Sequence, residues 1–182
     1  MSLQSILKAA PSLLLIATAA AAQQPTQPSQ PAKPAAPSSY AIPIGTSISL
    51  DVAKKAAAGA SAEAKKNGWF MAIAVVDPAG TLVYFEKADT TQLGSAQVAI
   101  GKARSAALYK RPTKAFQDGL EKGGANLRIL ALEGAVPVDG GVPLLVDGKL
   151  VGALGVSGDL AENDGKCAAS GAAALGPATA TR

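Results

Sequence analysis

A group of basic and aromatic side chains around Arg111-Pro112 is the part of the sequence best suited to chemistry. Lysine and arginine bind carboxylates through charge-assisted hydrogen bonds, and aromatic rings pack against flat apolar groups. Such a combination would hold a flat, anionic ligand. The alternative is a solvated helix surface with two buried rings. The members of the group are Lys102, Arg104, Tyr109, Lys110, Arg111, Thr113, Lys114 and Phe116.

Histidine is absent from all 182 residues. This absence excludes Ser-His-Asp and Cys-His catalytic sites, histidine-ligated zinc and histidine-ligated haem within one chain. The single cysteine, Cys167, lies among alanines in a predicted helix, so we expect a buried, unreactive thiol and no internal disulfide. The domain must therefore be stabilised by its core or by oligomerisation.

The acidic residues near position 160 have the spacing of a helix start. Asp159 and Glu162 are three residues apart, as in a capping box. Together with Asn163 and Asp164 they do not match an EF-hand calcium loop. The glycines at 152, 155 and 158 lie in a predicted strand, unlike those of a dinucleotide-binding turn. The sequence therefore assigns no metal site and no nucleotide site.

Residues 140–158 are predicted to form the central β-hairpin. Two apolar runs, 142–146 and 149–156, are joined by Asp147-Gly148, a turn that tolerates positive φ. The turn sets a register with three predicted pairs: Val146 with Lys149, Leu145 with Leu150, and Leu144 with Val151. Both faces are apolar, so we expect both to be covered. The glycines would let a helix, a partner backbone or a flat ligand approach closely, and helix packing is the simplest of these.

Hydrophobic periodicity predicts the remaining elements. They are a helix at 50–66, strands at 71–76 and 81–86, helices at 91–109 and from Pro112 onward, and a helix at 160–175. Ser49 is the predicted N-cap of the first helix, and Asn67-Gly68 is predicted to end it. Residues 125–138 are ambiguous: a helix at 128–132 and a short strand at 135–138, leading into the central hairpin, are both compatible with the sequence. This order predicts an α/β (α+β) sandwich on an antiparallel sheet, not a doubly wound parallel fold.

The first 39 residues are expected to lie outside the folded domain. Residues 1–22 have the pattern of a secretory signal peptide, with an apolar run too short for a comfortable membrane span. Residues 23–39 carry a proline at every third position, as in a polyproline II linker. A single domain should occupy 40–182, in the periplasm or secreted. The chain has 17 basic and 13 acidic residues, too mild an excess for nucleic-acid binding.

Three sequence blocks resemble the GlcG/HbpS family of haem-binding-type proteins. They are NGWFMAIAVVDPAGTLVYFEKAD at 67–89, AIGKARSAALYKRPTKAF at 99–116 and GGVPLLVDGKLVGALGVSG at 140–158. The resemblance covers about residues 47–175. It implies a profilin/PAS-like sandwich with a five-stranded antiparallel sheet, homo-oligomers and, in some members, binding or degradation of haem.

We therefore expect a secreted protein that binds haem or a related tetrapyrrole and is not an enzyme. Lys102, Arg104 and Arg111 are candidate partners of the propionates. With no histidine, the iron ligand would be a side chain of another type or water. Tyrosine is a known axial ligand type. The candidate iron ligands are Tyr84, Tyr109, Met71, Cys167 and the Thr113 hydroxyl.

Two alternatives to haem binding stay open. The first is a binding or sensory module for a small organic acid, which would use the same basic groups. The second is a structural, oligomerising protein in which the hairpin is the interface between subunits.

Overall fold

The computed structural model describes residues 41–176, which lie within the predicted domain of residues 40–182. The predicted signal peptide and proline-rich linker lie outside the described residues. Within the described range, every helix is too short or too polar to traverse a bilayer.

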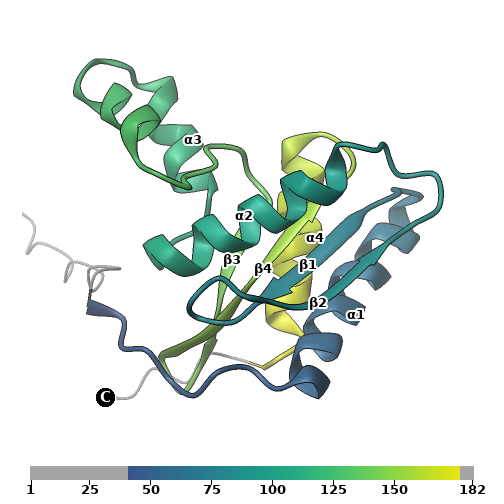
Figure 1. Cartoon of the computed structure of the whole chain (residues 1–182). Coiled ribbons are helices and arrows are strands. Elements are labelled where there is room, and N and C mark those ends of the chain that lie inside the picture. The colour runs from purple at the N-terminus through teal and green to yellow at the C-terminus, as the bar shows by residue number, and fades with distance from the viewer. Residues whose placement is uncertain (1–40, 177–182) are drawn as a thin grey trace, which may run out of the picture. The chain divides into compact units, whose positions relative to one another are not determined.

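The core of the fold is a four-stranded antiparallel sheet (Figure 1) with the strand order β2-β1-β4-β3. The strands are β1 (Ala72–Val76), β2 (Leu82–Lys87), β3 (Gly141–Val146) and β4 (Lys149–Ser157). An antiparallel sheet with helices was predicted and is confirmed, but the predicted count of five strands is wrong. The likeness to profilin and PAS folds stays a prediction.

The segment 135–138 does not form the short strand that its apolar residues indicated. Pro137 has no N–H to give to a ladder. The N–H of Val136 is bound at 3.1 Å by the Ser105 hydroxyl of the neighbouring helix. Because Pro137 lacks a backbone donor and the Val136 N–H is bound by a side chain, the segment does not join the sheet. Near the N-terminus, Ile44 makes only an isolated parallel bridge with Leu150.

Helices cover both faces of the sheet, as the apolar strands predicted. Helices α1 (Leu50–Asn67) and α4 (Ala161–Ala173) pack on the face that carries Ile73, Val75, Leu154 and Val156. Helix α2 (Ser95–Tyr109) packs on the opposite face. That second contact is made of small residues: Ala72, Ala74, Val76 and Ala153 on the strands, against Ala99, Ala103, Ala106 and Ala107 on the helix.

The central hairpin is confirmed, with a correction to its register. Asp147 and Gly148 both have positive φ, 49° and 70°, as the turn requires. The pairs of Val146 with Lys149 and of Leu145 with Leu150 are present. The predicted pair of Leu144 with Val151 is wrong, because a β-bulge makes Leu144 face Gly152.

The helix starts also differ in detail from the prediction. Helix α2 begins at Ser95 and not at Thr91. The N-cap of α4 is Leu160, so the capping box of Asp159 and Glu162 is wrong. The Asp159 carboxylate does stabilise the helix start, since it accepts a hydrogen bond from the Leu160 N–H at 2.7 Å.

Two short helices connect α2 to β3 and project away from the sandwich (Figure 1). They are α3 (Lys114–Glu121) and the 3-10 helix η2 (Gly124–Ala131).

Candidate functional site

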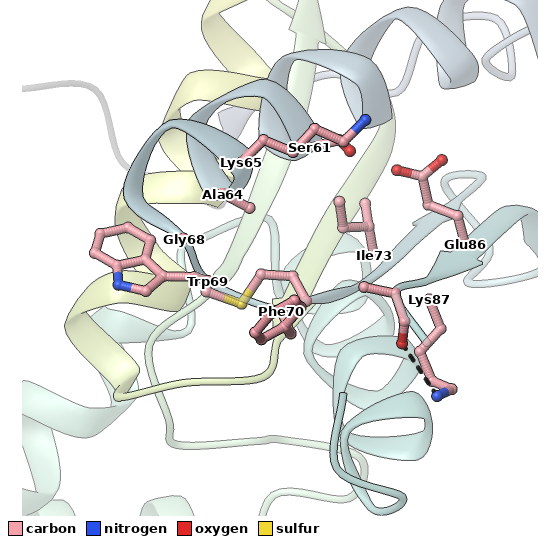
Figure 2. A pocket seen from close by; sticks show the side chains of 11 residues that line it. Ser61, Ala64, Lys65, Gly68, Trp69, Phe70, Ile73, Glu86 and Lys87 are labelled. Carbon is pink, nitrogen blue, oxygen red and sulfur yellow. Dashed lines mark hydrogen bonds between the residues drawn. The ribbon is translucent and has the colours of Figure 1, made fainter. Parts of the chain in front are cut away.

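A pocket of about 460 Å³ opens between the C-terminal half of α1 and the adjoining ends of β1 and β2 (Figure 2). Its volume is in the usual range for small-molecule sites, roughly 300–1,000 Å³. The residues that line it are Ser61, Ala64, Lys65, Gly68, Trp69, Phe70, Met71, Ile73, Glu86, Lys87 and Ala88.

The end of α1 creates the apolar wall of the pocket. Gly68 adopts a left-handed conformation with φ 73°, which stops the helix and turns the chain toward the sheet. Three large side chains then follow in a row: Trp69, Phe70 and Met71. Phe70 is 55% exposed, although it belongs to the pocket wall. Ligand pockets are lined mainly by apolar and aromatic side chains, so the exposed Phe70 ring is available to a ligand.

Two lysines lie at the rim of this apolar wall. Lys65 comes from the last turns of α1, and Lys87 ends β2. The Lys87 ammonium donates to the Ala88 carbonyl at 3.3 Å and to the Thr91 carbonyl at 3.4 Å. The pocket therefore combines an apolar wall with two ammonium groups that can bind carboxylates.

Tyr84 lies next to the pocket, on the same face of the sheet. Its hydroxyl donates to the Glu86 carboxylate at 2.8 Å, and Glu86 lines the pocket. This hydrogen bond raises the pKa of Tyr84 above its ordinary value. Of the candidate iron ligands, Met71 itself lines the pocket, and Tyr84 is bonded to a residue that lines it.

The predicted group at Arg111-Pro112 forms a compact cluster at the junction of α2 and α3. The Tyr109 and Phe116 rings meet edge to face at 5.3 Å, and the Arg111 guanidinium lies 5.3 Å from the Phe116 ring centre. The Tyr109 hydroxyl donates to the Glu133 carbonyl at 2.6 Å. Phe116 is buried, so the cluster packs the start of α3 against the end of α2.

Thr113 and Arg104 are held by backbone groups. The Thr113 hydroxyl is fully buried and accepts a hydrogen bond from the Gly141 N–H at 2.9 Å, which fastens α3 to the start of β3. Arg104 is exposed, and its Nε donates to the Gly80 carbonyl at 3.1 Å. The six predicted residues therefore do not form one site, since Tyr84 lies on the other face of the sheet from α2.

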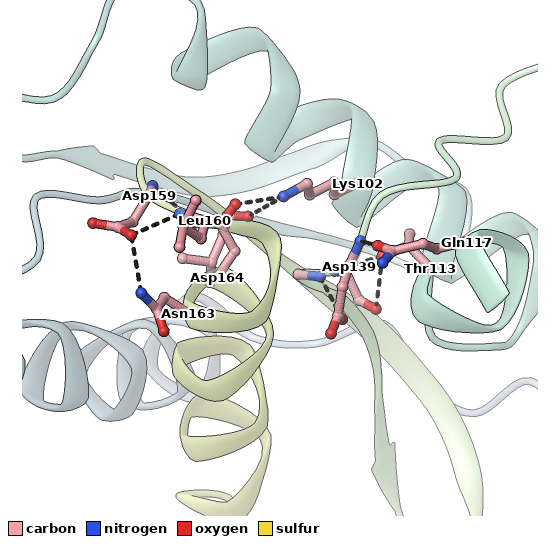
Figure 3. Close-up of polar contacts among 11 residues, drawn as sticks. Lys102, Thr113, Gln117, Asp139, Asp159, Leu160, Asn163 and Asp164 are labelled. Atoms are coloured by element: carbon pink, nitrogen blue, oxygen red, sulfur yellow. Dashed lines mark hydrogen bonds and ion pairs between the residues drawn. The ribbon is translucent and has the colours of Figure 1, made fainter. Parts of the chain in front are cut away.

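Lys102 lies inside the protein, paired with Asp164 (Figure 3). The two charged atoms are 2.7 Å apart, and the side chains are 1% and 3% exposed. The ammonium also donates to the Val156 carbonyl at 3.1 Å. Burial raises the pKa of Asp164 above its ordinary value, although the Lys102 ammonium opposes that shift. Lys102 was predicted to bind a ligand carboxylate, and in this structure its partner is a carboxylate of the chain itself.

The Cys167 thiol is predicted to be chemically inert in the folded protein. Burial, assisted by the charge of Asp164, raises its pKa to about 12, and only the thiolate reacts or binds metals well. Iodoacetamide at pH 8 should therefore leave the folded protein unlabelled and label it fully in urea. Mass spectrometry measures both, and labelling of the folded protein at the rate of a free cysteine would contradict the prediction.

Metal ligands do not gather anywhere in residues 41–176: no group of three or more Cys, Asp or Glu side chains there could hold an ion. The acidic residues near Asp159 instead bind backbone groups and Asn163.

Comparison with known proteins identifies the family to which the chain belongs. Protein GlcG of Escherichia coli K12 is 36% identical over 110 residues, which are 60% of this chain and 81% of GlcG. The crystal structure of a PduOC:haem complex has a TM-score of 0.65 and 27% identity, and it covers 72% of this chain and 96% of PduOC. A double mutant of HbpS from Streptomyces reticuli has a TM-score of 0.66 and 29% identity, over 81% of this chain and 100% of that one. The family model for the haem degrading protein HbpS-like family matches residues 48–173, so the chain belongs to the HbpS-like family.

Proposed function

We propose that this protein binds haem or a closely related tetrapyrrole in the pocket between α1, β1 and β2. The observation that carries the proposal is the lining of that pocket. Trp69, Phe70 and Met71 offer a broad apolar wall, and Lys65 and Lys87 stand at its rim. Haem has a flat apolar ring and two carboxylates, which match these two parts. Membership of the HbpS-like family and the haem-bound PduOC relative support the same ligand.

The side chains near the pocket fit haem without histidine. Methionine and tyrosine are both known axial ligand types. Met71 lines the pocket, and Tyr84 is bonded to the pocket residue Glu86. Cys167 is a poor candidate, because its buried thiol does not ionise near neutral pH. Bound haem would supply its own redox-active iron, and the residues of the chain would hold and orient it.

We further propose that the protein binds haem without degrading it, and that it works as a homo-oligomer in the periplasm or outside the cell. The signal-peptide pattern of residues 1–22 supports the location. Exposed leucines on and beside η2 support association, since clustered exposed apolar side chains mark interaction surfaces. These leucines are Leu108, Leu127, Leu130 and Leu132.

A haemin titration of tag-free protein that starts at Gln23 tests the proposal. A histidine tag must be absent, because it would supply the imidazole that the chain lacks. We expect a saturable Soret change with defined stoichiometry, and quenching of Trp69, the only tryptophan. Replacing both Lys65 and Lys87 with Ala should weaken binding at least tenfold, since charge-assisted hydrogen bonds contribute about 1.5–3 kcal/mol each.

The matched control is Lys54→Ala, an exposed lysine of α1 that does not line the pocket, and its affinity should equal that of the wild type. A Soret change weakened by Tyr109→Phe and not by the pocket variants would move the ligand to the α2–α3 junction. A linear, unsaturable change would exclude haem and favour a small organic acid.

A further inference from the structure

We infer that the buried Lys102–Asp164 pair positions the Phe70–Met71 wall of the pocket, so that Lys102 controls ligand binding without touching the ligand. The inference rests on the proposed use of that pocket. The contacts run from α2 through the start of α4 and the turn before it to the residues that follow α1. Each step is a direct contact between neighbouring groups.

The first step joins α2 to α4. Lys102 is fully buried in the middle of α2, and its ammonium lies 2.7 Å from Asp164, in the first turns of α4. The ammonium also holds the Val156 carbonyl near the end of β4. Gly140 leaves room for this arrangement, because a β-carbon there would lie 2.9 Å from the ammonium nitrogen. The pair therefore fixes α4 relative to α2 and the end of β4.

The second step joins Asp164 to the turn between β4 and α4. One carboxylate oxygen accepts a hydrogen bond from the Asp159 N–H at 3.2 Å, and this is the hydrogen bond that ties the carboxylate to the turn. Figure 3 shows the carboxylate placed between Lys102 and the Asp159–Leu160 segment. The position of the turn at residues 158–159 thus depends on where Lys102 holds Asp164.

The third step joins this turn to the pocket wall. Gly158 packs directly on the backbone that follows α1. A β-carbon at position 158 would overlap the Phe70 carbonyl oxygen and would lie 2.9 Å from the Met71 sulfur. Phe70 and Met71 both line the pocket. Any displacement of the turn therefore moves the wall, because close-packed groups transmit shifts.

A separate contact joins the start of α4 to the same wall. Lys166, two residues beyond Asp164, places its ammonium 5.6 Å from the centre of the Trp69 ring. Trp69 precedes Phe70 in the pocket lining. The position of the first turns of α4 therefore affects the pocket wall through two contacts, one from Gly158 and one from Lys166.

A buried ion pair contributes little net stability to a fold. Its desolvation cancels most of its attraction, and neutral side chains of similar volume are often as stabilising. Stability alone therefore does not account for Lys102 and Asp164. A pair with fixed directions supplies a defined placement of the turn, which a neutral contact does not.

The double variant Lys102→Met/Asp164→Asn tests the inference. Met fills the space of the lysine stem, and Asn keeps an acceptor for the turn. We expect an unchanged far-UV CD spectrum, a melting temperature close to that of the wild type, a shifted Trp69 emission maximum in the ligand-free protein, and haemin affinity lowered about tenfold. The matched control, Lys114→Met/Asp118→Asn, removes an exposed pair on α3 at the same 2.7 Å separation and should change none of these.

Gly158→Ala provides a second, independent variant. It disturbs the wall directly and leaves the ion pair intact, so it should reproduce the change in Trp69 emission. A double variant that is folded and has wild-type Trp69 emission and haemin affinity would overturn the inference. If the double variant does not fold, wild-type emission in Gly158→Ala would overturn it. If wild-type protein binds no haemin, the proposed function fails. The Trp69 emission of the ligand-free variants still tests whether the Lys102–Asp164 pair positions the pocket wall.

Discussion

Lys102→Met should lower the free energy of unfolding by about 3–5 kcal/mol at pH 7, because it leaves the Asp164 carboxylate buried without a counter-charge. That carboxylate is 3% exposed, so water cannot replace the lost ammonium. The Val156 carbonyl loses a donor in the same change. Urea denaturation followed by far-UV CD measures the loss.

The loss should depend on pH with a definite sign. Burial already raises the pKa of Asp164, and Lys102 opposes that shift. Without Lys102 the pKa rises further. A carboxyl whose pKa is higher in the folded state favours folding at low pH, and that contribution disappears as the pH rises through the folded-state pKa. The deficit of Lys102→Met relative to the wild type should therefore be smallest in acid and largest above neutrality.

Two variants separate the buried charge from a simple loss of an ion pair. Adding Asp164→Asn to Lys102→Met removes the unpaired charge and should restore most of the stability. Lys114→Met breaks an ion pair whose side chains are 55% and 43% exposed, and such pairs contribute about 1 kcal/mol or less. Equal losses in Lys102→Met and Lys114→Met, or a loss that does not vary with pH, would contradict this account.

Local signals in the sequence predicted most of the fold. The Asp147-Gly148 turn, the helix end at Gly68 and the N-cap at Ser49 each depend on residues adjacent in the chain, and all three are present. The wrong predictions concern segments whose conformation is not set by residues adjacent in the chain. The conformation of residues 135–138 depends on a hydrogen bond to Ser105. The bulge between Leu144 and Leu145 shifts a register that the turn residues alone do not specify.

The candidate site was less predictable, because it is assembled from segments far apart in sequence. Its wall follows α1 and its rim includes the end of β2. The local signal was the run Trp69-Phe70-Met71 directly after a helix-ending glycine, which placed large apolar groups at an exposed turn. Charge and aromatic content instead favoured the α2–α3 junction. Lys102 was singled out by its charge, but its partner is 62 residues away, and no spacing rule connects them.

Gly155→Ala should be destabilising by about 3 kcal/mol, which is a large effect for one methyl group. Gly155 lies in β4 directly under α2. A β-carbon there would overlap the Ala99 carbonyl oxygen and would lie 2.5 Å from the Ala103 nitrogen. Both are backbone atoms of a helix, so no side chain can rotate away and α2 must lift from the sheet.

The physical reason for this sensitivity is the composition of the α2 interface. Small residues, mostly alanines, line both sides of it, and at Gly155 the backbone of the helix lies directly against the strand. Gly94→Ala is the matched control. Position 94 has φ −65°, and a β-carbon added there would meet no other atom within 4 Å, so the stability of this variant should stay within about 1 kcal/mol of the wild type. Thermal and urea denaturation of both variants measure the difference. A similar, small effect of both alanines would mean that α2 does not pack on β4 as closely as the structure shows, and the burial of Lys102 that depends on this packing would then also be in question.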